Sequence, residues 1–207
     1  MEKFEALIGE MEEYGRSNHV PIINEKGMPV LLEMVRQKKP HRVLEIGTAI
    51  GYSSLLFALH GAEDIEITTL ELSEERINLA QSYINRSAYA DRIRIMAGDA
   101  AENLLRLQLT GQKFDFVFID AAKGQYVDYF HKIQPMLTDK AVILADNVLF
   151  RGYVRGDVPT PRRFKTIVKR LREYIELVSQ PPYATEILAQ GDGLAVTRRV
   201  LDYDKKA

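Results

Sequence analysis

Apolar and polar positions follow a helical spacing at the start of the chain. Residues 2–15 carry an apolar side chain at about every third or fourth position, and residues 28–35 repeat this spacing until Pro40 interrupts it. Such spacing predicts amphipathic helices that bury one face. We expect these helices, within residues 1–38, to pack on the main domain or on a second copy of the chain in a homodimer.

The middle of the chain alternates between short apolar runs and longer helical patterns. The runs are rich in β-branched and aromatic residues, which is typical of buried parallel strands. They cover residues 42–46, 65–70, 93–97, 114–119 and 141–145. Helices are predicted after Gly51 and over residues 73–85, 100–109 and 125–137. This alternation predicts a parallel sheet that helices cover.

The pattern changes after Asn147. Residues 148–160 contain glycine and proline and predict a loop, and Thr160-Pro161 has the order of a helix cap followed by a first-turn proline. Runs at residues 185–189 and 194–200 flank the Gly-Asp-Gly at 191–193, which indicates a β-hairpin. With no linker, we predict one α/β domain over residues 1–207 that ends in this hairpin.

Composition narrows the possible functions. The 207 residues suffice for one α/β domain, and a formal net charge of -1 gives no overall preference for nucleic acid or membrane. The chain has no cysteine, which excludes disulfides, thiolate catalysis and cysteine-bound zinc. No apolar run reaches membrane-spanning length and no signal-peptide core follows Met1, so we expect a cytoplasmic protein.

Oxygen-bearing side chains follow two of the predicted strands. Asp120 comes directly after one strand, and Asp146 and Asn147 follow the next. The carboxyl ends of parallel strands share one sheet edge, where open α/β sheets bind ligands. Two carboxylates and an amide oxygen suit Mg²⁺ or another hard divalent cation, and Lys123 lies close by in the sequence. The alternative is that each strand-end acid only caps a helix.

A glycine-containing turn after the first strand indicates a nucleotide-like cofactor. It reads Glu-x-Gly-x-x-x-Gly over residues 45–51, and Glu71 follows about twenty residues later, where a carboxylate can bind ribose hydroxyls. An NAD turn reads Gly-x-Gly-x-x-Gly around a pyrophosphate, which Glu45 would repel. Glu45 could instead help to hold the cationic tail of S-adenosylmethionine (SAM), with Asp99 near the adenine ring.

Three motifs carry a resemblance to a known family from about residue 19 to residue 200. They are Leu-Glu-Ile-Gly-Thr-Ala-Ile-Gly-Tyr-Ser at 44–53, Ile-Asp-Ala-Ala-Lys at 119–123 and Asp-Asn at 146–147. With them the chain resembles the class I, SAM- and metal-dependent O-methyltransferases typified by catechol and caffeoyl-CoA O-methyltransferases. The resemblance implies a Rossmann-like methyltransferase fold, with a doubly wound, mostly parallel seven-stranded sheet and a C-terminal antiparallel hairpin.

The resemblance also implies roles for residues of this chain. Asp120, Asp146 and Asn147 would bind Mg²⁺ or another hard divalent cation, with Asp120 and Lys123 catalytic and Lys123 the general base. Glu71 would bind the SAM ribose. Further cofactor contacts would come from Ile22, Glu45, Gly47, Ser53, Asp99, Ala100 and Asp120.

Longer motifs resemble one bacterial branch of that family. They read Ile-Asp-Ala-Ala-Lys-Gly-Gln-Tyr at 119–126, Asp-Asn-Val-Leu-Phe-x-Gly at 146–152 and Gly-Asp-Gly-Leu-Ala at 191–195. The branch includes the tRNA 5-hydroxyuridine methyltransferase, which forms 5-methoxyuridine at the wobble position. The resemblance therefore implies a tRNA anticodon stem-loop as the partner.

Basic residues gather directly after the predicted metal ligands. Between positions 151 and 172, with Asp157 the single acid, they are Arg151, Arg155, Arg162, Arg163, Lys165, Lys169, Arg170 and Arg172. We predict a stripe on one helix face that suits a phosphate backbone, formed by Arg162, Lys165, Lys169 and Arg172. Aromatic residues that could stack on an unpaired base are Tyr52, Tyr126, Phe150 and Tyr153. The alternative is a solvated helix face with aromatic residues that only pack.

Metal chelation alone leaves the acceptor open. A catechol and 5-hydroxyuridine both offer two adjacent oxygens, and a divalent ion would lower the pKa of the hydroxyl in either. One alternative to a tRNA enzyme is therefore a small-molecule catechol or phenol O-methyltransferase of the same fold. A second, from another class, is a non-catalytic SAM- or nucleotide-binding module.

Overall fold

The computed structural model describes residues 2–20, 22–23 and 27–200, and within them one seven-stranded sheet runs in the order β3-β2-β1-β4-β5-β7-β6. Five strands are parallel: β1 (Arg42–Ile46), β2 (Glu66–Glu71), β3 (Ile93–Ala97), β4 (Phe114–Ile119) and β5 (Leu137–Ala145). The hairpin of β6 (Tyr183–Leu188) and β7 (Leu194–Arg199) adds two antiparallel strands. The predicted mostly parallel sheet with its C-terminal hairpin is confirmed.

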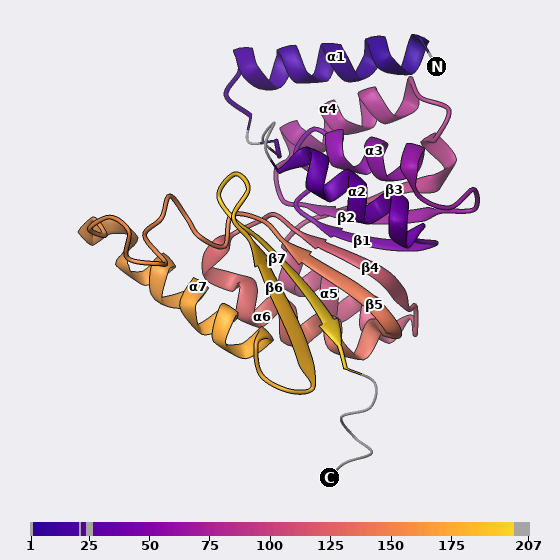
Figure 1. The fold of residues 1–207 in the computed structure, drawn as a ribbon. Coiled ribbons are helices and arrows are strands. Elements are labelled where there is room, and N and C mark those ends of the chain that lie inside the picture. Colours follow the sequence, from indigo (N-terminus) through magenta and orange to yellow (C-terminus); the bar gives the residue numbers. More distant parts are fainter. Residues whose placement is uncertain (1, 21, 24–26, 201–207) are drawn as a thin grey trace.

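Helices cover both faces of the sheet, as Figure 1 shows. One side carries α1 (Glu2–Ser17), α2 (Met28–Lys38), α3 (Tyr52–His60) and α4 (Glu74–Asn85). The other side carries α5 (Ala100–Leu109), α6 (Tyr126–Ile133) and α7 (Lys165–Val178). Short 3₁₀ turns lie at Ala90–Arg92, Lys123–Gln125, Gln134–Met136 and Arg162–Phe164. No described helix combines the length and the apolar character needed to cross a bilayer.

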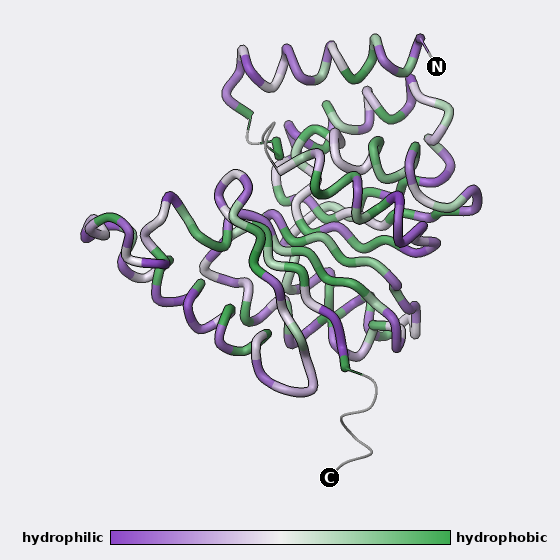
Figure 2. Tube along the Cα trace, viewed as in Figure 1, coloured by the Kyte–Doolittle hydropathy of each residue, from purple (hydrophilic) through white to green (hydrophobic). Residues whose placement is uncertain are grey.

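Alternate side chains along the strands build two separate cores. On β4, Phe116 and Phe118 pack in the cluster under α1–α4, whereas Val117 and Ile119 pack in the cluster under α5–α7. Such alternation is what a strand buried on both faces requires, and it makes the strands nearly continuous in hydrophobic residues (Figure 2). The sheet is thereby a rigid support for the loops at its carboxyl edge.

Helix α1 is tied to the first face of the domain by apolar and polar contacts. Leu7 and Met11 are buried in the cluster under α1–α4. Nη1 and Nη2 of Arg86 both donate hydrogen bonds to the Glu10 carboxylate. Residues 1–38 therefore pack on the domain wherever the structure describes them. Pairing with a second copy of the chain stays a prediction.

The bounds of two predicted helices were wrong. The helix predicted over residues 125–137 ends at Ile133, because Pro135 cannot continue it and the chain passes through a 3₁₀ turn into β5. The helix predicted from Thr160-Pro161 begins instead at Lys165. Pro161 is extended, with φ -56° and ψ 146°, and Phe164 occupies the cap position without a side-chain cap hydrogen bond.

Candidate active site

A cavity of about 360 Å³ lies at the carboxyl edge of the parallel strands, the edge at which the sequence predicted a ligand site. We call it the strand-end cavity. It is lined by segments that follow β1 to β5 in turn, together with residues before α2. Its predicted site residues are Ile22, Gly47, Ser53, Glu71, Asp99, Ala100, Asp120, Lys123, Asp146 and Asn147.

The turn after β1 brings two strand ends into close contact. Gly47 has φ +105°, and a Cβ added there would lie 2.1 Å from the backbone oxygen of Asp120. The backbone nitrogens of Gly47 and Thr48 donate to the carbonyl of Leu70, at 3.0 and 3.1 Å. Only glycine allows this close approach, so the turn fixes the position of Asp120 relative to the end of β2.

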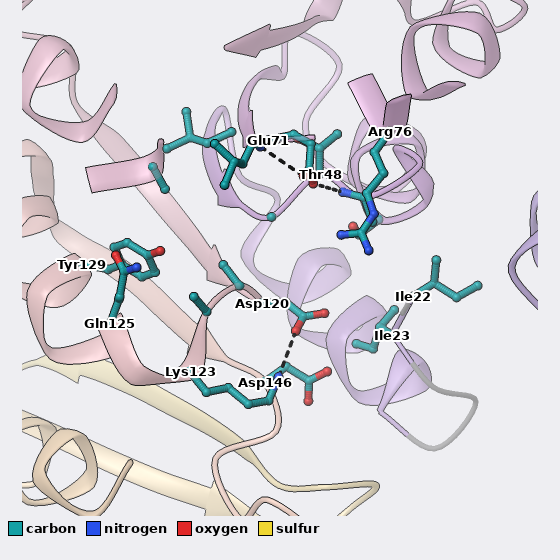
Figure 3. Close-up of a pocket in the computed structure, with 18 of the residues that line it drawn as sticks. Ile22, Ile23, Thr48, Glu71, Arg76, Asp120, Lys123, Gln125, Tyr129 and Asp146 are labelled. Carbon is teal, nitrogen blue, oxygen red and sulfur yellow. Dashed lines mark hydrogen bonds and ion pairs between the residues drawn. The ribbon is translucent and has the colours of Figure 1, made fainter. Parts of the chain in front are cut away.

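The Glu71 carboxylate is held at the cavity wall by backbone donors. It accepts hydrogen bonds from the nitrogens of Ala49 at 2.9 Å, Leu72 at 3.1 Å and Ser73 at 3.0 Å (Figure 3). A carboxylate has about four acceptor positions, so one remains for a ligand. The geometry fits the predicted ribose contact, because the oxygen is fixed in place and faces the cavity.

Asp120, which is half-buried, and Asp146, which is buried, present their carboxylates to the same cavity. Burial and the neighbouring charge of Asp120 raise the pKa of Asp146 to about 7. Burial also raises the pKa of Asp120, which the ammonium group of Lys123 counteracts with its Nζ 3.9 Å from Asp120 Oδ1. Figure 3 shows the two carboxylates and Lys123 together. A cation between the two carboxylates would stabilise their charged forms.

The donor set fits a hard divalent cation better than a soft one. Among the described residues no group of three or more His, Cys, Asp or Glu side chains could hold a metal. Two carboxylates and the amide oxygen of Asn147 are the set available at the cavity, and oxygen ligands suit Mg²⁺. Asn147 has φ +56°, a strained conformation that asparagine tolerates and that is common at functional sites.

Glu45 lies beneath the strand-end cavity and does not line it. Its side chain is fully buried and accepts hydrogen bonds from the hydroxyls of Ser53, Ser54 and Thr69. Burial raises its pKa to about 7. Ser53 lines the cavity and donates its hydroxyl hydrogen to Glu45, whereas a direct contact between Glu45 and a cofactor stays a prediction. Glu45 orients Ser53.

Asp99 combines the capping role with a place at the cavity. Its side chain accepts a hydrogen bond from the backbone nitrogen of Glu102 at 3.2 Å, which caps α5, and the same residue lines the wall beside Ala100. The two interpretations of a strand-end acid are thus compatible here.

The cavity residues that the sequence interpretation missed include three with long side chains that carry polar groups: Arg76, Gln125 and Tyr129. Figure 3 shows the Arg76 side chain reaching in from α4. Its place in the first turn after the Ser73 cap was a usable signal, because that turn begins beside the end of β2. The direction of the Tyr129 side chain depends on how α6 is rotated about its axis against the sheet. The sequence of α6 does not reveal this rotation.

The predicted basic stripe on α7 was wrong in part. Arg162 lies in the 3₁₀ turn before the helix, and Arg172 donates to the backbone oxygens of Val154 and Tyr153, at 2.9 and 3.2 Å. Lys169 and Arg170 both reach Glu173, which lies just past the segment considered. The exposed cations that remain are Arg151, Arg155, Arg162, Arg163 and Lys165.

The aromatic residues proposed for base stacking are engaged in packing. Tyr126 is fully buried, with its hydroxyl 3.0 Å from the backbone oxygen of Asp146, and Tyr52 is buried with its hydroxyl donating to Glu12. Phe150 and Tyr153 form one cluster with Phe164, at centroid distances of 5.2 to 5.8 Å. Tyr126 and Tyr52 therefore cannot stack on a base in this conformation.

Comparisons with known proteins agree on one family. A family described as O-methyltransferase matches residues 11–200. Tapetum-specific methyltransferase 1 of Arabidopsis thaliana is 28% identical over 198 residues, which are 93% of this chain and 81% of that protein. Caffeoyl-CoA O-methyltransferase 1 of Eucalyptus globulus is 29% identical over 178 residues, which are 83% of this chain and 70% of that protein.

Solved structures are similar over nearly the whole chain. A protein from Staphylococcus aureus has a TM-score of 0.83 at 34% identity, covering 93% of this chain and 91% of that one. An O-methyltransferase from Bacillus cereus, solved in complex with SAH (S-adenosylhomocysteine), has a TM-score of 0.83 at 26% identity, covering 94% and 90%. The cofactor product is therefore bound in a structural relative of this chain.

Proposed function

Because this chain belongs to the O-methyltransferase family, we propose that it transfers the methyl group of SAM to a substrate hydroxyl held beside Asp120 and Asp146. The observation that carries the proposal is the composition of the strand-end cavity. One continuous space brings the fixed Glu71 carboxylate together with two carboxylates, an amide oxygen and a lysine. A cofactor and an acceptor can then meet within a single cavity.

The cavity residues fit SAM as the resident cofactor. Glu71 would accept from a ribose hydroxyl with its remaining acceptor position, and Asp99 and Ala100 would border the adenine ring. Gly47 and Ser53 would border the methionine part, and Ile22 would cover it. Bound SAM supplies an electrophilic methyl group.

Asp120, Asp146 and Asn147 would hold a hard divalent cation, with Mg²⁺ the proposed ion. A bound ion of this kind lowers the pKa of a chelating hydroxyl and orients it. Lys123 is the proposed general base. Its amine lies 3.9 Å from Asp120 and lines the same cavity, close enough to accept the proton of a hydroxyl held there.

The acceptor we propose is a small aromatic diol. Several similar proteins bear the name of a small-molecule enzyme, caffeoyl-CoA O-methyltransferase. The four aromatic residues that could stack on a base are engaged in packing. A second candidate acceptor is 5-hydroxyuridine in a tRNA anticodon stem-loop. It is supported by five exposed cations after the proposed metal ligands, Arg151, Arg155, Arg162, Arg163 and Lys165.

Mass spectrometry of products tests the proposal. The protein is incubated with SAM and Mg²⁺ and with either an aromatic diol or tRNA bearing 5-hydroxyuridine, with a metal chelator as the control. We expect a monomethyl ether of the diol that disappears with the chelator. Methylation of the tRNA nucleoside alone would establish the second candidate. SAM binding without transfer to either acceptor would favour a non-catalytic binding module.

A further inference from the structure

The hydroxyl of Tyr126 joins the ends of the two strands that carry the proposed cation ligands. Tyr126 is the first residue of α6, is fully buried, and does not line the strand-end cavity. Its hydroxyl lies 3.0 Å from the backbone oxygen of Asp146 and 3.4 Å from that of Ile119, the residue before Asp120. One side chain from outside the cavity therefore connects the two segments that supply the carboxylates.

The pairing of β4 with β5 ends at this point. Ile119 and Ala145 are the last paired residues, and the backbone nitrogen of Asp146 donates to the oxygen of Ile119 at 2.9 Å. At the next residue, Asn147, the backbone has φ +56°. Because the sheet no longer sets the spacing of the two segments here, the Tyr126 hydroxyl constrains where Asp146 lies relative to Asp120.

This hydroxyl remains a hydrogen-bond donor near neutral pH. Burial raises the pKa of Tyr126 well above its ordinary value, and the nearby charges of Asp120 and Asp146 add to the rise. The phenol therefore keeps its hydrogen, and the bond to the Asp146 carbonyl does not depend on ionisation of the tyrosine.

The neighbouring Tyr174 on α7 shows that burial alone does not demand such a bond. The two rings pack edge to face with their centroids 5.5 Å apart, and both side chains are fully buried in the cluster under α5–α7. Among the described residues the Tyr174 hydroxyl has no hydrogen-bond partner. The two tyrosines thus share one core and differ in that only the hydroxyl of Tyr126 reaches the strand ends.

We propose that Tyr126 is a positioning residue for the cation site: its hydroxyl holds the ends of β4 and β5 at the spacing that lets Asp120, Asp146 and Asn147 bind one hard divalent cation. A small hard cation tolerates little departure from its preferred geometry, so groups that orient its ligands strongly affect its affinity. The inference rests on the proposed function, which supplies the cation, and adds to it a residue outside the cavity.

The pair of tyrosines provides a matched test. Tyr126→Phe removes the hydroxyl and keeps the ring, and Tyr174→Phe makes the same change in the adjacent ring. The probe is Mn²⁺, and its binding to the intact protein in the presence of SAH is followed by the electron paramagnetic resonance signal of the free ion. Asp146→Asn, which removes a proposed ligand charge, identifies the binding that occurs at this site. SAH affinity without metal reports whether each variant keeps its fold.

We expect Tyr126→Phe to weaken Mn²⁺ binding by about tenfold or more, whereas Tyr174→Phe should leave it within about twofold of the unaltered protein. SAH affinity should be equal in all three proteins, because neither tyrosine lines the strand-end cavity. Unchanged Mn²⁺ affinity in Tyr126→Phe, an equal loss in Tyr174→Phe, or a loss of SAH affinity together with Mn²⁺ affinity would overturn the inference.

Methyl transfer to an aromatic diol and to tRNA bearing 5-hydroxyuridine is measured against Mn²⁺ concentration, so that the two proposals fail separately. A positioning role predicts that Tyr126→Phe raises the half-saturating Mn²⁺ concentration by about tenfold, while the rate at saturating Mn²⁺ approaches that of the unaltered protein. Transfer with an unchanged Mn²⁺ dependence in Tyr126→Phe removes only the positioning role.

Weakened Mn²⁺ binding in Tyr126→Phe, without any transfer by the unaltered protein, supports the positioning role and contradicts the proposed function. Mn²⁺ binding that Asp146→Asn leaves unchanged contradicts both proposals, because the cation is then bound elsewhere.

Discussion

A single contact explains why position 47 is glycine. A Cβ on Gly47 would meet the backbone oxygen of Asp120 at 2.1 Å, whereas one on Gly111 would meet nothing within 4 Å, although both residues have positive φ. We expect Gly47→Ala to reduce the free energy of unfolding by at least about 2 kcal/mol more than Gly111→Ala. Denaturant unfolding of the two variants checks this. Similar losses would mean that backbone strain, and not the contact, sets the cost.

Lys123 carries the proposed proton transfer. Lys123→Ala should lower the rate of methyl transfer by about 10²–10⁴-fold while SAM affinity stays unchanged, because the lysine lies at the carboxylate end of the cavity. Single-turnover kinetics and SAM titration measure the two effects. Lys140→Ala, at an exposed position outside the strand-end cavity, is the control. Loss of SAM binding together with turnover would assign Lys123 a structural role.

Glu45 predicts a pH dependence of stability. Its pKa is raised by burial from 4.5 to about 7, so between these values the folded protein keeps a proton that the unfolded chain releases. Stability is therefore fully present below the unfolded pKa and falls as the pH rises through about 7. In Glu45→Gln this loss should be smaller by an amount on the order of 3 kcal/mol.

The comparison needs denaturant unfolding of both proteins at several pH values between 5 and 8, without divalent ions. Asp120 and Asp146 are present in both proteins, so the difference isolates Glu45. Parallel curves for the two proteins would show that the buried carboxyl does not titrate over this range.

At the scale of elements, α7 fixes the loop that follows the proposed metal ligands. The Arg172 guanidinium donates to the backbone oxygens of Val154 and Tyr153. Arg172→Ala should destabilise the protein by about 1–2 kcal/mol and speed proteolysis within residues 148–160, because two carbonyls lose their donor. Arg163→Ala, whose guanidinium only stacks on Phe164, should do neither. Equal proteolysis rates in the two variants would contradict the anchoring role.

The strands could be predicted because their apolar runs are short and bounded by polar residues. β1, β3 and β4 have the predicted bounds, and residues that directly follow a strand, such as Asp120 and Asp146, reach the expected sheet edge. The first and last residues of other elements were harder to predict. β5 begins at Leu137, since pairing with Phe114 extends it beyond its apolar run.

Side-chain direction could not be predicted from the sequence. Glu45, like Glu71, lies near the end of a strand. Its side chain is nevertheless buried, and three hydroxyl groups donate hydrogen bonds to its carboxylate. Tyr126 directly follows the 3₁₀ turn that begins at Lys123, yet it is fully buried. Both outcomes depend on which partners the tertiary structure brings close.

At the scale of the whole molecule, the described structure offers two approaches to the strand-end cavity. One passes through a mostly apolar space of about 910 Å³ between the end of α1, the start of α2 and the tip of the β6–β7 hairpin. The other runs past the exposed cations of residues 151–165. The formal net charge of -1 does not reveal that the two approaches differ in charge, because acidic and basic side chains are distributed unevenly over the surface. The proposed acceptor class therefore rests on the local lining and not on the overall composition.

We propose that one cavity joins a SAM site to a hard-cation site. The most direct test is a crystal structure of the protein with SAH and Mn²⁺, in which anomalous scattering locates the metal. We expect an anomalous peak bound by Asp120, Asp146 and Asn147, with the SAH ribose on Glu71 in the same cavity. A peak elsewhere, or SAH bound away from Glu71, would contradict it.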